Sequence, residues 1–225
     1  MKKIIVSISM LVMVMSIFIS TSNAKQQIPE DVYNAAKQGL DNFKTIATSN
    51  YEGYGYKKAE DIISTELGWG YQVYTINYDK LLSNEFENVR DVAEVSDKWE
   101  FMVTLDKKEM SLIYVEKDES NTYKPVGFGG NGNKFNVVYS KMFNNENCIN
   151  PIIVKDMEDY YLVYNNPSSK EVVIPIVKDS TSKAIKSKQM LNNIKNRVKN
   201  YKLGERGGSL STASSKTNNN ADTNY

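Results

Sequence analysis

The feature that most constrains the fold is a series of short apolar strands separated by turns of about four residues. In the clearest strand, residues 99–105, aromatic and aliphatic side chains alternate with Glu100, Met102 and Thr104. This two-residue period is typical of a strand. Turns at 106–109 and 118–121 separate it from further candidate strands at 110–117 and 123–128. Turns this short join antiparallel neighbours, because a parallel connection needs a crossover of a dozen or more residues. The sequence therefore predicts an antiparallel meander.

Other segments rich in aromatic and β-branched residues extend the expected sheet. They lie at residues 71–76, 152–154, 160–164 and 172–177. Pro175 falls within the last of them. Because proline cannot donate a hydrogen bond to a neighbouring strand, we expect this segment to be an edge or bulged strand.

Helices are expected before and after these strands. The first begins at Pro29 and runs to about Ile46, with acidic residues near its positive end. A shorter one follows near residues 59–63 and is expected to stop at Gly68, a suitable C-cap residue. Residues 135–142 and 181–202 have helical spacing as well. The predicted class is α+β: a mostly antiparallel sheet with N-terminal and C-terminal helices packed on it.

Three glycines, Gly127, Gly129 and Gly132, match the spacing G-x-G-x-x-G of dinucleotide-binding proteins. That motif requires a parallel strand–helix–strand unit. Here the preceding strand belongs to the antiparallel series, so we interpret the glycines as a turn that leads into a core helix. No cofactor is predicted.

The amino terminus has the pattern of a cleavable secretory signal peptide. Lys2 and Lys3 precede an apolar segment up to Ile19, and small residues at Ser22 and Ala24 suit signal peptidase. We expect cleavage after Ala24, one domain over residues 25–203, and a disordered tail over 204–225, where apolar residues become scarce. The expected location is extracellular, and the composition suggests a Gram-positive bacterium.

A single cysteine, Cys148, is present, so no intramolecular disulfide can stabilise the domain. We expect a buried, unreactive side chain. An intermolecular bridge is the alternative.

Charge is distributed unevenly along the chain. Residues 25–182 carry 17 basic and 25 acidic side chains, whereas residues 183–202 carry seven basic and none acidic. The expected helix over 181–202 is therefore amphipathic and cationic, with Lys188, Lys195 and Lys202 along one side of its apolar stripe. It could bind an anionic surface, such as a membrane or a cell-wall polymer. Alternatively, it could pack on the acidic body, where Glu85, Glu87, Asp91, Glu94, Asp97 and Glu100 are close in sequence.

The segments L-G-W-G-Y-Q-V-Y-T-I at 67–76, W-E-F-M-V at 99–103 and the glycine turn after Tyr123 resemble a group of uncharacterised secreted α+β domain proteins of Gram-positive bacteria. The resemblance covers about residues 60–177. It implies a small α+β domain and supplies no catalytic residue, since the group has no assigned activity.

Catalytic possibilities are narrowed by the complete absence of histidine. Without it, Ser-His-Asp and Cys-His sites and histidine-based zinc sites cannot be built. We predict no catalytic and no metal-binding residues. A carboxylate-based hydrolase of cell-wall polymers or glycans stays open as the alternative, because the chain has many Asp and Glu residues.

The function predicted is therefore a secreted, non-enzymatic binding or interaction protein. Aromatic side chains in a glycine-spaced region, Tyr54, Tyr56 and Trp69, are candidate contacts for sugars or peptides, with core packing as the alternative. The partner is expected to be an anionic surface or an extracellular protein. A modulator of a protease that pairs through the edge strand over 172–177 is a further alternative. Nucleic acid is not expected, because the body is acidic.

Overall fold

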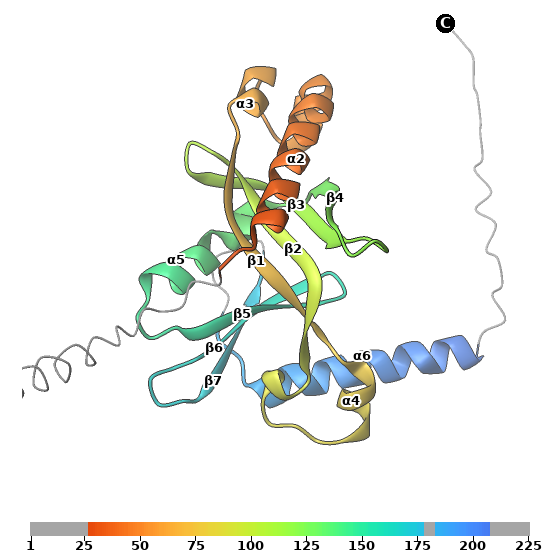
Figure 1. Ribbon diagram of the computed structural model, residues 1–225. Helices are drawn as coiled ribbons and strands as arrows, with labels where there is room; N and C mark the ends of the chain where they lie inside the picture. Colours follow the sequence, from red (N-terminus) through yellow and green to blue (C-terminus); the bar gives the residue numbers. More distant parts are fainter. Residues whose placement is uncertain (1–26, 178–182, 208–225) are drawn as a thin grey trace, which may run out of the picture.

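The computed structural model describes residues 27–177 and 183–207. The expected signal peptide and residues 208–225 of the expected tail lie outside the described residues. One seven-stranded sheet, in the order β4-β3-β2-β1-β5-β6-β7, forms the centre of the molecule (Figure 1). The strands are β1 Glu66–Ile76, β2 Ala93–Leu105, β3 Lys108–Lys117, β4 Tyr123–Gly129, β5 Ile149–Asp156, β6 Asp159–Asn165 and β7 Glu171–Ile176.

All neighbouring strands are antiparallel except β1 and β5. The helices are α2 Glu30–Ala47, α3 Ala59–Ile63, α4 Tyr78–Ser83, α5 Asn136–Asn144 and α6 Ser187–Gly207, with 3-10 turns η1 Thr48–Tyr54, η2 Val89–Asp91 and η3 Gly132–Phe135. The α+β class with a mostly antiparallel sheet is therefore confirmed.

The meander β2–β3–β4 forms as predicted. Asp106 and Lys107 connect β2 to β3 with φ of 50° and 64°, a left-handed conformation suited to a tight hairpin. Between β3 and β4, the Asp118 carboxylate accepts hydrogen bonds from the backbone N–H groups of Ser120 and Thr122. Local sequence thus determines this half of the sheet.

Helix α2 covers the meander at one end of the sheet. Its buried residues Val32, Ala36 and Phe43 pack against Phe101 and Ile113. The helix approaches closely because Gly39 faces the sheet: a Cβ there would lie 2.5 Å from Ile113 Cγ2. The predicted first helix is confirmed in its position and nearly in its bounds.

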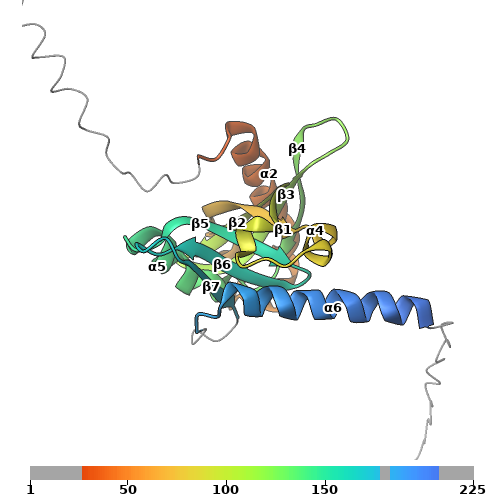
Figure 2. The same ribbon diagram turned by 90° about the horizontal axis from the view of Figure 1, so that it is seen from below.

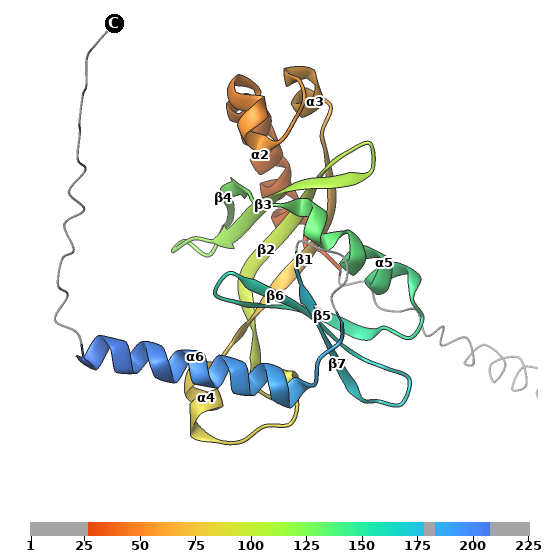
Figure 3. The ribbon, with the colours of Figure 1, turned by 180° about the vertical axis from the view of Figure 1, so that it is seen from behind.

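Helix α6 covers the β5–β7 end of the sheet, beside α4, and extends past it (Figures 2 and 3). Its apolar face, which includes Met190 and Ile194, packs against Val154 and Val163. The helix begins at Ser187, later than the expected start, because Ile185 is still extended and forms a bridge with Val173 of β7. It continues to Gly207, past the expected domain boundary at residue 203.

Along the strands, the side chains that contact α2 or α6 alternate with side chains that point to the opposite face of the sheet. There η3 and α5 place Phe135 and Val138 on Met102, Ile153 and Leu162. The strand before this helix, β4, is antiparallel as predicted, but it includes Gly127 and Gly129, and only Gly132 lies in the connection that leads into the helix. A Cβ at Gly132 would lie 2.8 Å from the backbone nitrogen of Ser111, so this glycine permits close packing.

One expected helix end is wrong. Helix α3 ends at Ile63 and Gly68 lies inside β1. Gly68 instead allows β1 to pack closely on β2, because a Cβ there would lie 2.8 Å from Thr104 Cγ2. Pro175 lies in β7, which is an edge strand of the sheet as predicted.

Candidate functional site

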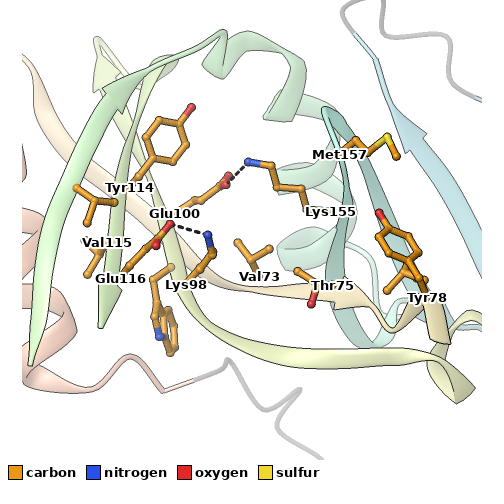
Figure 4. A pocket seen from close by; sticks show the side chains of 13 residues that line it. Val73, Thr75, Tyr78, Lys98, Glu100, Tyr114, Val115, Glu116, Lys155 and Met157 are labelled. Atoms are coloured by element: carbon orange, nitrogen blue, oxygen red, sulfur yellow. Dashed lines mark hydrogen bonds and ion pairs between the residues drawn. The ribbon is translucent and has the colours of Figure 1, made fainter. Parts of the chain in front are cut away.

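A pocket of about 430 Å³ opens on the sheet beside the area that η3 and α5 cover (Figure 4). Strands β1, β2, β3 and β5 supply most of its walls. The lining residues are Val73, Thr75, Ile76, Tyr78, Lys98, Trp99, Glu100, Tyr114, Val115, Glu116, Val126, Lys155 and Met157. The pocket therefore lies between the meander and β5, the strand that follows the meander and α5 in the chain.

Glu100 is the most buried charged side chain of the pocket, with 3% of its surface exposed. Its carboxylate accepts hydrogen bonds from the hydroxyls of Tyr71 at 2.5 Å and Tyr160 at 2.9 Å, and from Lys155 Nζ at 3.3 Å. Burial, followed by the nearby Glu100 charge, raises the pKa of both tyrosines well above its usual range. The hydroxyls therefore remain donors, and each oxygen of the buried carboxylate accepts at least one hydrogen bond.

Two lysines lie near this carboxylate. Lys155 Nζ is 4.9 Å from the ring centre of Tyr160 and 5.7 Å from that of Tyr114. Lys134 Nζ, at η3, lies 4.1 Å from the Tyr160 ring centre. Burial lowers the pKa of Lys134; Glu100 opposes this shift and Lys155 adds to it. Two ammonium groups thus lie near one aromatic ring, and of these two lysines only Lys155 lines the pocket.

A second ion pair lies on the pocket wall, between Lys98 and Glu116 at 2.9 Å, and is partly exposed (Figure 4). Glu116 and Glu100 occupy diagonal positions on β3 and β2, since Glu116 pairs with Lys98 and Glu100 with Tyr114. The pocket consequently holds two carboxylates, and each has a lysine partner.

The exposed part of the pocket contains two apolar side chains beside the exposed Lys98. Val126 of β4 is 57% exposed, and Met157, in the turn between β5 and β6, is 50% exposed. Tyr78 is fixed because its hydroxyl donates to Asp156 at 2.6 Å. Val126 and Met157 thus form an exposed apolar rim, and Glu100 forms a buried charged floor. Apolar lining with a few polar or charged groups is common in sites that bind small ligands.

The aromatic side chains proposed from the sequence do not form one surface. Tyr54 packs on Phe43 and Phe128, and Tyr56 is buried in the same cluster under α2. Trp69 instead belongs to the cluster on the opposite face, against Phe135. Core packing, the alternative interpretation, describes Tyr54 and Tyr56 well.

Two lysines of α6 contact acidic residues in the loop that follows α4. Lys188 pairs with Glu87 at 2.7 Å and Lys195 with Glu85 at 2.9 Å. Lys202 lies on α6, but its side chain is outside the part that the structure describes. These contacts match the intramolecular alternative, and binding of an anionic surface stays a prediction.

Sequence reasoning missed the site around Glu100. It placed Glu100 among the acidic residues available to the basic helix, whereas this carboxylate is buried beneath Tyr71 and Tyr160. The signal in the sequence was the position of β2 between an earlier strand and a hairpin, which is typical of a central strand. Both faces of a central strand can be covered, so a charged residue on β2 can be buried. The partners Lys134, Lys155 and Tyr160 are too distant in sequence to be associated with it.

Three further properties bear on the chemistry. Cys148 is buried, as predicted, and burial raises its pKa to about 11. Within residues 27–177 and 183–207, no group of three or more Asp, Glu or Cys side chains is arranged to hold a metal ion. No helix in the described part of the chain is long and apolar enough to cross a membrane.

Comparisons with known proteins supply no function for this chain. No protein-family model, no curated protein and no solved structure matches this chain. The resemblance to secreted α+β proteins of Gram-positive bacteria therefore stays a prediction.

Proposed function

We propose that this protein is a secreted binding module that holds part of its ligand in the pocket between the meander and β5. The observation that carries the proposal is the exposed apolar rim, Val126 and Met157, above the buried Glu100 network. A buried ion pair is weak as a source of stability, because desolvating the charges offsets most of their attraction. A charged floor inside an open pocket is better explained by recognition of a polar group.

A cell-wall polymer or an extracellular peptide has the chemistry that this pocket requires. Each offers apolar or ring surfaces for the rim together with polar groups for the floor. The secretory signal predicted from the sequence would bring the protein to such ligands.

The test is sedimentation of residues 25–225 with purified Gram-positive cell wall. We expect binding that the rim substitutions Val126→Lys and Met157→Lys reduce about tenfold, since each places a charge where an apolar contact is needed. Val95→Lys is the matched control, because Val95 is also an exposed strand valine, 56% exposed, but does not line the pocket. Equal binding by all three variants would contradict the proposal.

The hydrolase alternative keeps one supporting observation, the two carboxylates Glu100 and Glu116 in one pocket. Glycosidases use two such groups, one of which must hold a proton to give. Glu100 only accepts hydrogen bonds, from three donors, and Glu116 is paired with Lys98, so neither is set up as a proton donor. Release of reducing ends from cell wall, abolished by Glu116→Gln, would establish the hydrolase and displace the binding proposal.

A further inference from the structure

The part of the pocket rim that Met157 forms lies at the tip of the hairpin between β5 and β6. Only Met157 and Glu158 separate the two strands, and Met157 has a φ of 55°. Asp156 and Asp159 flank this turn and pair directly across the two strands. Like charges in directly opposite positions destabilise a hairpin, and Glu158 adds a third carboxylate. A cation from elsewhere in the chain is therefore required to offset the repulsion.

Arg197 of α6 supplies that cation. Its guanidinium donates one hydrogen bond to Asp156, which is 1% exposed, and another to Asp159 at 2.6 Å. One arginine thus bridges the two carboxylates on either side of Met157. The planar guanidinium, with several donors in a fixed arrangement, suits such a bridge better than the ammonium of a lysine does.

Asp156 also connects α6 to a second residue of the pocket. Its other carboxylate oxygen accepts a hydrogen bond from the Tyr78 hydroxyl at 2.6 Å. Tyr78 and Met157 both line the pocket, whereas Arg197 does not (Figure 4). Tyr78 packs in addition against the apolar cluster that α6 forms with the sheet. Two residues of the pocket wall are therefore fixed by contacts that lead to α6.

We propose that Arg197 is a positioning residue for the pocket, and that the pocket binds its ligand with full affinity only while α6 is docked on the sheet. This inference rests on the proposed function, because it concerns how the same pocket is held in its binding form. A rim that is ordered before binding loses less conformational freedom when the ligand arrives. Without the bridge, Met157 would lie at a free hairpin tip that the ligand itself would have to order. A partner that draws α6 away from the sheet would consequently lower the affinity of the pocket.

The first measurement is ¹⁵N relaxation of residues 25–225, which reports the order of each backbone amide without any ligand. In the wild type we expect order parameters of about 0.85 at Met157 and Glu158, typical of rigid backbone. Arg197→Gln should lower both values to about 0.6 or less and leave that of Met102, buried in the sheet, unchanged. A general loosening of the protein would lower all three.

The second measurement is sedimentation with purified Gram-positive cell wall. We expect Arg197→Gln to weaken binding about two- to tenfold, the effect of having to order one more side chain on binding. Lys188→Gln is the matched control, because Lys188 lies on the same helix and pairs with Glu87 at 2.7 Å, and neither residue lines the pocket. It should leave the turn rigid and change wall binding less than about twofold.

Arg197→Lys keeps the test possible if Arg197→Gln does not fold. It retains a positive charge beside the buried Asp156 but cannot bridge both carboxylates with the same geometry. We expect its order parameters at Met157 and Glu158 to lie between those of the wild type and those of a free turn. Values equal to the wild type in each folded Arg197 variant, or an equal fall at Met102, would overturn the inference.

The two measurements also separate this inference from the proposed function. Wall binding that is lost in the rim variants but unchanged in folded Arg197→Gln would retain the binding module and reject the positioning role. A wild-type protein that does not bind cell wall would contradict the proposed function, while the order parameters would still decide whether Arg197 holds the turn.

Discussion

At the scale of single residues, Glu100 is where the largest effect of one substitution is expected. Glu100→Ala would leave the hydroxyls of Tyr71 and Tyr160 and the ammonium of Lys155 without their acceptor. Removing one partner of a buried ion pair costs about 3–5 kcal/mol of unfolding free energy. Urea denaturation measures this loss. Glu116→Ala, which removes a partly exposed ion pair, should cost no more than about 1 kcal/mol, and comparable losses in the two variants would contradict our description of the site.

Cys148 allows a second test at this scale. Its thiol is buried and its pKa is raised to about 11, so little of the reactive thiolate is present near neutral pH. We expect a thiol reagent to label the protein only after unfolding in urea. Rapid labelling of the native protein, or a disulfide-linked dimer on a non-reducing gel, would instead support the intermolecular bridge considered from the sequence.

At the scale of elements, α6 should behave as an integral part of the fold. Ile194 is buried against the β5–β7 end of the sheet, and truncation of a buried isoleucine costs about 2–5 kcal/mol. Lys195 pairs with the exposed Glu85, and such surface pairs contribute about 1 kcal/mol or less. We therefore expect Ile194→Ala to lower the melting temperature strongly and Lys195→Ala to lower it slightly. The reverse order would indicate that α6 is held mainly by charge.

Elements that depend on neighbouring residues could be predicted from the sequence, and elements that depend on distant ones could not. The hairpin β2–β3 follows from local alternation and a short turn, and the edge position of β7 follows from Pro175. The pairing of β1 with β5 has no local signal, because the two strands are joined through the whole meander and α5. The same limit hid the pocket, whose lysines come from β2 and β5 and whose carboxylates come from β2 and β3.

At the scale of the whole molecule, we expect stability to fall steeply in alkali. Burial raises the pKa of Tyr56, Tyr78 and Tyr114 to about 12, and it raises the pKa of Tyr71 well above its usual range. Because the folded state retains these protons more tightly than the unfolded chain, their contribution is complete below pH 10 and is lost as pH rises through the folded pKa values. Lys134 and Arg90, whose pKa values burial lowers, act in the opposite direction, but they are fewer than the buried tyrosines.

Circular dichroism and tyrosinate absorbance followed together from pH 9 to 13 test this expectation. The chain has 15 tyrosines and several are exposed, so only the part of the tyrosinate signal that belongs to the buried phenols should appear in one cooperative step with the loss of the helical signal. Ionisation of all the tyrosines while the helical signal is unchanged would show that the buried hydroxyls are accessible to solvent.

The parallel contact between β1 and β5 has a consequence for how the molecule assembles and how a ligand would affect it. Three residue pairs, from Val73↔Ile153 to Thr75↔Lys155, join β1 to β5. This seam connects the locally paired strands β1–β4 to the locally paired strands β5–β7. Closing the long loop between them is the costly step, so each half can form its hairpins before the halves join. The pocket exists only when the seam is closed, since Lys155 and Met157 lie on one side and Lys98, Glu100 and Tyr114 on the other. Whatever occupies the pocket would therefore clamp the two halves together and slow hydrogen exchange along β1 and β5 by mass action.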